Sequence, residues 1–302
     1  MLLKQKHFCW NITPRCNANC GFCHRMNNIS ELPLEANRKI LNDLISSGVR
    51  KITWTGGEAL LYQGIDELIK ISHDNGVRNH LITNGKELTK ERLEKLLESL
   101  NFITLSLDAC LDKLNFQIGR FENQFELVNK ILDNLNVLEY SGNIKINTLA
   151  CSYNLYHIPE MLDFIEKNRI EKWKIFKFVD LRWYSIKNKK EYEISDEQFS
   201  LLKHNIACIS KCKQILPDKI VFVDGNDLED DYILIRADGA VIVTRDKNDR
   251  VLGNLLFDNI TNIISSNYNL IFRWLNRMLN LLIKIQHSIF VQYGFFIFVF
   301  LI

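Results

Sequence analysis

Strand-like and helix-like segments alternate six times between residues 7 and 212 of this 302-residue chain. Apolar runs predict strands at 7–12, 49–54, 77–83, 102–108, 144–150 and 172–178. Helical patterns follow them at 33–47, 62–75, 89–100, 122–139, 157–167 and 195–212. Strands that are each followed by a helix are typical of parallel strands with right-handed crossovers. We therefore expect an α/β sheet or barrel whose functional groups gather at the carboxyl ends of the strands.

Beyond residue 215 the helical pattern gives way to short strands with short turns between them. These strands are predicted at 219–223, 232–238 and 240–244. The turn Asp238–Gly239 predicts a hairpin that is appended to the main sheet. The chain is accordingly divided into a core barrel (1–215), a β extension that closes the site (216–264) and a divergent apolar tail (265–302).

Composition excludes some classes of function. The net charge is only +2, so no overall basic field indicates direct binding of nucleic acid. The first residues, MLLKQKHFCWNIT, lack the apolar core and the cleavage site of a signal peptide. We therefore expect a cytoplasmic protein, in which clustered cysteines are more often metal ligands than disulfides.

Three of the eight cysteines lie in the segment RCNANCGFCHR, just after the first predicted strand. The spacing Cys16-x3-Cys20-x2-Cys23 lets three thiolates reach three corners of a 4Fe–4S cube and leaves one iron without a protein ligand. An open metal position is typical of a reactive site rather than a structural one. A zinc site is the alternative, but zinc needs a fourth ligand, and His24 is poorly spaced for that role.

This segment resembles the signature of the radical S-adenosylmethionine (SAM) superfamily. In that superfamily a CxxxCxxC loop follows the first strand of a partial (β/α)6 barrel of the TIM type. The resemblance implies that Cys16, Cys20 and Cys23 hold a 4Fe–4S cluster, and that the amino and carboxylate groups of SAM chelate the open iron. Reduction of the cluster then cleaves SAM to a 5′-deoxyadenosyl radical. The expected fold is such a barrel with a C-terminal β-hairpin extension.

The motif TGGE after the second predicted strand resembles the superfamily segment that holds the SAM amino group. The resemblance makes Gly56, Gly57 and Glu58 cofactor-binding residues. Asn84 ends the third predicted strand and Ser106 lies near the end of the fourth, which are further places where the superfamily contacts SAM. Taken singly, each of these two polar residues has an alternative role as a cap of the next helix.

From about residue 8 to residue 256 the chain is similar to viperin and its prokaryotic relatives. The matching segments are CNANCGFCHR, LPLEANRKIL, VRKITWTGGEAL, LITNG, QIGRF, IKINTLACSYN, KWKIFKF and DDYILIRADG. Viperin-type enzymes abstract the C4′ hydrogen of a ribonucleoside triphosphate and lose the 3′-hydroxyl as water. The resemblance implies a nucleotide dehydratase that converts CTP, GTP or UTP to the 3′-deoxy-3′,4′-didehydro nucleotide. This product terminates viral RNA synthesis, so the implied role is antiphage defence.

A triphosphate needs several cations that converge on one site. Lys145 and Asn147 share one face of a predicted strand, and Lys172 and Lys174 share one face of the next, because alternate residues point the same way. Lysines inside a barrel are costly unless an anion is bound. The alternative is that they point outward between the helices. Carried over from the family, the substrate contacts are Asn11, Lys51, Arg120, Lys145, Asn147, Lys172 and Lys174.

Tyr232 matches a family tyrosine near the ribose, and the resemblance makes it the catalytic residue. A phenol can supply a proton, or an electron and a proton together, when the 3′-hydroxyl leaves. The alternative is a strand tyrosine that packs its ring. The segment TRDKNDR (244–250) is polar and basic enough to close over phosphates, with an ordinary solvated turn as the alternative.

Residues 285–302 contain no formal charge but are interrupted by Gln286, His287, Gln292 and Gly294. Such a tail is marginal for a membrane span, and we expect it to cover the barrel rather than to contact a membrane surface. The expected partners are a nucleoside triphosphate and a cellular reductant of the flavodoxin or ferredoxin type. The alternative function is a radical SAM enzyme on another substrate, such as a queuosine-pathway-like carbocycle synthase or a peptide-modifying enzyme. A non-catalytic nucleotide-binding protein with a structural cluster is the third reading.

Overall fold

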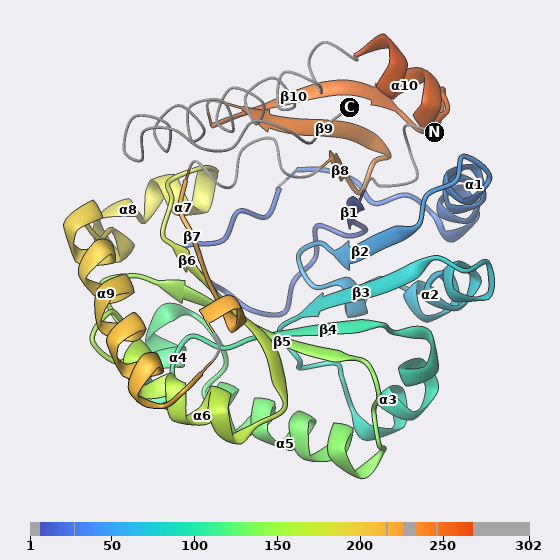
Figure 1. Cartoon of the computed structure of the whole chain (residues 1–302). Helices are drawn as coiled ribbons and strands as arrows, with labels where there is room; N and C mark the ends of the chain where they lie inside the picture. The colour runs from blue at the N-terminus through green and yellow to red at the C-terminus, as the bar shows by residue number, and fades with distance from the viewer. Residues whose placement is uncertain (1–6, 27, 216, 226–232, 246, 268–302) are drawn as a thin grey trace, which may run out of the picture.

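The computed structural model describes residues 7–267 apart from 27, 216, 226–232 and 246 (Figure 1). Within these residues ten strands form one sheet in the order β10-β9-β8-β1-β2-β3-β4-β5-β6-β7. The run from β8 through β1 to β7 is parallel, whereas β8–β9 and β9–β10 are antiparallel. The strands are β1 (His7–Asn11), β2 (Lys51–Thr55), β3 (Arg78–Thr83), β4 (Phe102–Ser106), β5 (Asn143–Ala150), β6 (Ile170–Lys177), β7 (Ile220–Val223), β8 (Ile233–Ile235), β9 (Ala240–Arg245) and β10 (Asn248–Asn254).

The sheet curves into a partial barrel, and the larger helices lie on its outer side (Figure 1). The α-helices are α1 (Leu34–Ser46), α2 (Ile65–Asp74), α3 (Lys90–Leu96), α4 (Asp112–Ile118), α5 (Gln124–Val137), α6 (Met161–Lys167), α7 (Trp183–Lys187), α8 (Lys189–Tyr192), α9 (Asp196–Cys212) and α10 (Ile260–Ser266). Short 3-10 helices cover Ala59–Leu61, Leu97–Ser99, Ile158–Glu160 and Pro217–Lys219. This arrangement confirms the predicted fold class.

Successive residues of a strand face the hydrophobic core and the barrel interior in turn. The side chains of Phe8, Trp10, Trp54 and Trp173 are fully buried in the main hydrophobic core. The Trp10 and Trp54 rings stack with their centroids 5.3 Å apart. Residues that alternate with these on the same strands, such as Lys174, point to the other face of the sheet. The interior of the barrel is therefore polar while the space under the helices is apolar.

The six predicted strand–helix units are all present, with shifts of a few residues at their ends. The Thr89 hydroxyl accepts a hydrogen bond from the Arg92 N–H at 3.3 Å and so caps the start of α3. Helices α4, α7, α8 and α10 were not predicted. They span only 7, 5, 4 and 7 residues, which is too short for helical periodicity to show in a sequence.

The chain beyond residue 215 joins both edges of the sheet. The predicted hairpin is confirmed, because β8 and β9 pair around Asp238–Gly239 and β8 also pairs with β1. Strand β7, which we grouped with the β extension, lies beside β6 at the opposite edge. The segment 244–250 was expected as a loop, but it contains the end of β9 and the start of β10. An ion pair between Arg182 and Asp249, 2.7 Å long, links β10 to the segment after β6.

Two predictions fall on residues that the structure does not describe. These are the assignment of Tyr232 and the role of the tail 285–302, which lies outside the described ranges together with all residues from 268. Within the described ranges, no helix combines the length and the apolar character that crossing a bilayer requires.

Candidate active site

The cysteine segment lies just beyond the carboxyl end of β1. Backbone N–H groups donate to the sulfur atoms of Cys16 at 3.4 Å and Cys23 at 3.3 Å. The Cys20 thiol donates to the carbonyl of Gly119 at 3.3 Å. Burial raises the pKa of Cys20 to about 12. A metal deprotonates the cysteines that it binds, so the two N–H donors point at atoms that would then carry negative charge.

The donor set distinguishes an iron–sulfur cube from a single metal ion. Among the described residues, no group of three or more His, Cys, Asp or Glu side chains is placed to hold one metal ion. The zinc alternative thus finds no ready site in that part of the chain. In a 4Fe–4S cube each cysteine binds its own iron, so the three sulfurs need not converge on one point.

The turn Gly56–Gly57 packs directly against the backbone that leads into the cysteines. The N–H of Gly57 donates to the carbonyl of Thr13, and the N–H of Glu58 donates to the carbonyl of Arg15, both at 2.7 Å. A Cβ at Gly57 would lie 2.2 Å from the carbonyl oxygen of Arg15, and one at Gly56 would lie 2.4 Å from that of Thr13. Only glycine allows this approach, so the turn holds the cysteine segment against β2.

Glu58 is buried at the point where β2 and β3 end, with 1% of its surface exposed. Its carboxylate accepts hydrogen bonds from the hydroxyl of Thr83 (2.8 Å) and the N–H groups of Asn84 (2.8 Å) and Leu60 (3.2 Å). Burial raises the pKa of Glu58 although these donors oppose the shift. A carboxylate has about four acceptor positions, so the group is held rigidly and keeps capacity for one further donor.

Asp108 and Arg120 form a buried ion pair beside the cysteines. The guanidinium Nε donates to a carboxylate oxygen of Asp108 at 2.7 Å, and the other oxygen accepts from the N–H of Leu149 at 2.7 Å. The Arg120 guanidinium also lies over the ring of Phe22, 5.0 Å from its centroid. Burial alone would lower the pKa of Arg120, but Asp108 and the Cys20 thiol keep it above its ordinary value.

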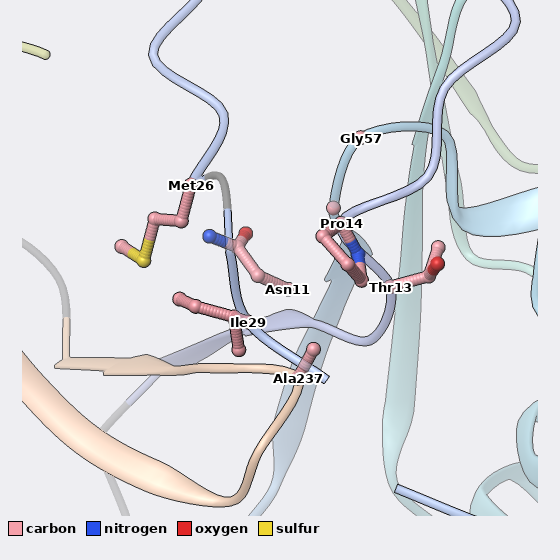
Figure 2. Close-up of a pocket in the computed structure, with 8 residues that line it drawn as sticks. Asn11, Thr13, Pro14, Met26, Ile29, Gly57 and Ala237 are labelled. Atoms are coloured by element: carbon pink, nitrogen blue, oxygen red, sulfur yellow. The ribbon is translucent and has the colours of Figure 1, made fainter. Parts of the chain in front are cut away.

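A small pocket adjoins the glycine turn (Figure 2). It is lined by Asn11, Thr13, Pro14, Met26, Ile29, Gly56, Gly57 and Ala237. In Figure 2 the side chains of Asn11, Met26 and Ile29 extend into the same space, which the Gly57 turn borders from the opposite side. Asn11 ends β1, so it lies at the carboxyl end of the barrel with the glycine turn.

Four lysines line the interior of the barrel. Lys145 is paired in register with Lys172 across β5 and β6, and Asn147 is paired with Lys174. The Nζ atoms of Lys51 and Lys145 both lie over the ring of Phe102, 4.9 and 4.3 Å from its centroid. Burial first, and then the charge of Lys51, lower the pKa of Lys145 to about 8. The alternative in which these lysines point outward between helices is therefore wrong.

A row of hydrogen-bonding side chains crosses the interior beside the lysines. Thr53 Oγ1 contacts a ring nitrogen of His7 and lies 3.1 Å from Nδ1 of His80, whose Nε2 lies 2.7 Å from Oγ1 of Thr104. Burial, together with the charge of Lys51, lowers the pKa of His7 to about 4, and burial together with the charge of Lys145 lowers that of His80 to about 2. Both rings are thus neutral at pH 7. We did not single out this row, although its members alternate with apolar residues at strand period and could have been found that way.

Comparison with known proteins decides the family. The profile of the Radical SAM superfamily matches residues 10–165, which include the three cysteines and the glycine turn. The chain belongs to the radical SAM superfamily.

Individual proteins of this superfamily are also similar to the chain. The chain is 29% identical over 245 residues to the S-adenosylmethionine-dependent nucleotide dehydratase of Flammeovirga pacifica. This match covers 72% of this chain and 83% of that protein. It is 35% identical over 163 residues to the GTP 3′,8-cyclase of Chlorobaculum tepidum, 52% of this chain and 49% of that one. The crystal structure of Streptococcus suis SuiB bound to S-adenosylmethionine has a TM-score of 0.65 at 18% identity and supports the fold alone; the match covers 85% of this chain and 64% of SuiB.

As a radical SAM enzyme the chain uses a 4Fe–4S cluster and SAM. The residues present fit both groups. Three cysteine sulfurs with backbone donors suit the cluster, and the glycine turn places the buried Glu58 carboxylate beside the cysteine segment. The resemblance to the viperin family is confirmed by the curated relatives that carry the dehydratase name.

The structure separates the predicted substrate contacts into two groups. Lys51, Lys145, Asn147, Lys172 and Lys174 share the barrel interior. Arg120 instead is bound to Asp108 next to the cysteines, and Asn11 lines the pocket at the glycine turn. Arg120 lies apart from the lysines because Gly119 turns the chain at a φ of +101° and packs against the Asn19–Cys20 backbone.

Proposed function

We propose that the chain is a SAM-dependent dehydratase of a ribonucleoside triphosphate, with the 3′-deoxy-3′,4′-didehydro nucleotide as product. The observation that carries the proposal is the lysine group inside the barrel. Lys51, Lys145, Lys172 and Lys174 are half-buried, and none of them forms an ion pair with a carboxylate of the described residues. Partly desolvated cations that are not paired with a carboxylate are unfavourable until a multivalent anion binds them.

The proposed cofactor site lies at the carboxyl end of the barrel. Cys16, Cys20 and Cys23 would hold the cluster, and Glu58 would accept a hydrogen bond from the SAM ammonium. The cluster and SAM together supply hydrogen-atom abstraction from the substrate. Arg120, held by Asp108 beside the cysteines, is a cation whose guanidinium suits either the SAM carboxylate or a substrate phosphate.

Lys51 and the glycine turn of the proposed cofactor site lie at different depths along β2. Lys51 begins β2 and the glycine turn follows its last residue, Thr55. At about 3.3 Å per residue, these ends are roughly 13 Å apart. Lys174 is in register with Asn147, which is in register with Ser106 at the end of β4. A triphosphate that reaches from Lys51 toward Lys174 would therefore point its ribose toward the cofactor end. This orientation would present the C4′ hydrogen to the cofactor.

Loss of the 3′-hydroxyl as water requires a proton and an electron. Tyr232 is our proposed donor to the substrate, on the strength of the family resemblance, and lies outside the described residues. The reductant is proposed to be a flavodoxin or ferredoxin type of protein. CTP, GTP and UTP are the proposed substrates, and the proposed role of the product is defence against phage.

The test measures 5′-deoxyadenosine and nucleotide products with the reconstituted enzyme, SAM, a reductant and each of the four triphosphates. We expect one or more triphosphates to stimulate turnover, and the matching diphosphate and nucleoside to do so far less. Lys145→Ala should weaken substrate binding by about ten- to a hundredfold, because a charge-assisted contact contributes about 1.5–3 kcal/mol. Lys70→Ala, at a lysine with an exposed side chain, is the matched control and should change nothing.

Other results would favour the alternatives. Equal stimulation by the free nucleoside would contradict a triphosphate site. No stimulation by any of the four triphosphates would point to a radical SAM enzyme on another substrate, such as a peptide or a carbocycle precursor. A cyclised nucleotide in place of the didehydro product would place the chain with the GTP 3′,8-cyclase instead.

A further inference from the structure

One buried amide joins the ends of β3 and β4. Gln124 is the first residue of α5 and has no exposed surface. Its Nε2 donates to the carbonyl oxygen of Asn84 at 2.9 Å and to that of Ser106 at 2.8 Å. Asn84 directly follows β3, and Ser106 is the last residue of the adjacent strand β4. A single NH2 group therefore sets the separation between the ends of these two strands.

The residues that Gln124 holds also belong to the proposed SAM site. The N–H of Asn84 donates to the Glu58 carboxylate at 2.8 Å. The Asn84 amide donates to the side chain of Asn17, within the cysteine segment, at 2.9 Å. The Gln124 amide thus completes a chain of contacts that runs from Ser106 through Asn84 to both Glu58 and the cysteine segment.

A glutamine at this position has no evident role in packing. The other core positions on the same helix are apolar, for example Val128 and Ile131. A fully buried glutamine is uncommon in proteins. Moreover, its Oε1 atom is buried and has no hydrogen-bond partner among the described residues. A buried polar group with one end unsatisfied needs an explanation, and here both of its N–H donors are used on the two strand ends.

We infer that Gln124 is a positioning residue for SAM, because it fixes the ends of β3 and β4 so that Asn84 and Ser106 face the cofactor together. This inference rests on the proposed assignment of Asn84 and Ser106 as SAM contacts. Gln124 acts through these two residues. A donor is required for the role, so an apolar side chain of the same length cannot replace it.

The experiment compares Gln124→Met with the wild type as reconstituted, full-length protein. Iron content reports the cluster, equilibrium dialysis gives the dissociation constant for SAM, and electron paramagnetic resonance of the reduced cluster is recorded with and without SAM. We expect unchanged iron content, SAM affinity weakened by about ten- to a hundredfold, and a smaller change of the spectrum on SAM addition. Affinity for inorganic triphosphate should stay as in the wild type.

Asn79 provides a matched control at the other end of β3. Its amide is also fully buried and donates to two carbonyls, those of Ile69 at 3.0 Å and Ser99 at 2.9 Å. Asn79→Leu should lower thermal stability and leave SAM affinity unchanged. If Gln124→Met does not fold, Gln124→Asn keeps both N–H donors on a shorter side chain, and it should weaken SAM binding in the same direction.

Two results would overturn the inference, and they can be told apart from a failure of the site assignment. SAM affinity that is unchanged in Gln124→Met, or weakened equally in Asn79→Leu, would show that Gln124 has only a structural role. Asn84→Ala and Ser106→Ala test the assignment itself. If neither variant weakens SAM binding, the assignment is wrong and the inference falls with it; if both do while Gln124→Met does not, the inference alone is wrong.

Discussion

The carboxyl end of the barrel and its interior differ in whether their charged side chains have partners of opposite charge. At the carboxyl end Asp108 is paired with Arg120 at 2.7 Å, and the Glu58 carboxylate accepts three hydrogen bonds. In the interior Lys51 and Lys145 rest on the ring of Phe102. Within the described ranges no carboxylate forms an ion pair with either lysine. The first region is therefore complete before a ligand arrives, whereas the second is completed by an anion.

The two regions should respond differently to substitution. Removing one member of a buried pair leaves an uncompensated charge, which is strongly destabilising. Removing one of several like charges instead relieves repulsion and desolvation. Stability should therefore fall on substitution in the first region and hold or rise in the second, while ligand binding is weakened in both.

The largest effect is expected at the cysteines. Cys16→Ala, Cys20→Ala and Cys23→Ala combined should abolish iron binding, because no other cysteines lie in the cysteine segment. Anaerobically reconstituted wild type should hold about four irons per chain. Cys208→Ala with Cys212→Ala, two exposed cysteines on α9, is the control and should keep the full iron content. A triple variant that retains the cluster would refute the ligand assignment.

The next largest effect concerns the buried pair. Arg120→Met should lower the free energy of unfolding by about 3–5 kcal/mol, because Asp108 has no exposed surface and would be left without its cation. Chemical denaturation measures this change. Arg120→Met combined with Asp108→Asn should recover part of the loss. A loss below 1 kcal/mol in the single variant would mean that the pair is not preformed, and the comparison would fail.

The third prediction concerns an interior lysine, whose loss should not lower stability. Lys145→Met should leave the melting temperature of the ligand-free protein unchanged or raise it, because one half-buried cation among several is removed. Inorganic triphosphate should raise the melting temperature of the wild type by mass action, and this rise should be much smaller in the variant. A ligand-free Lys145→Met protein that melts well below the wild type would show that Lys145 is structural instead.

The smallest effect is a dependence on pH. Lys145 has its pKa lowered to about 8, and a bound polyanion would raise it. Below pH 8 the lysine is already charged, so triphosphate affinity should be flat there as far as this group is concerned. Above pH 8 a proton must be taken up on binding, and affinity should fall by up to about tenfold per unit until the pKa of the complex is reached. Calorimetry in buffers of different ionisation enthalpy measures the proton uptake, which should disappear in Lys145→Met. A flat profile from pH 7 to 10 would contradict this coupling.

Much of the barrel could be predicted from sequence, because its signals are local. The six strand–helix units show as apolar periodicity, and the cysteine spacing and the glycine turn show as short motifs. The lysine group was also predictable, since residues two apart on a strand share a face whatever the rest of the chain does. Strand β10 shows no such signal, because its pairing with β9 defines it. The short helices show none either, because tertiary contacts rather than periodicity define them.

Local motifs predict that three thiols, a glycine turn and a set of strand lysines gather in one barrel. Which part of the barrel each group occupies depends on contacts between residues far apart in the chain. Arg120, for example, follows the turn at Gly119, and this turn places its side chain against Asp108 and beside the cysteines. Gln124 reaches two strand ends that lie 40 and 18 residues away. Contacts of this kind depend on register and chain direction across the sheet, and a linear sequence does not display either.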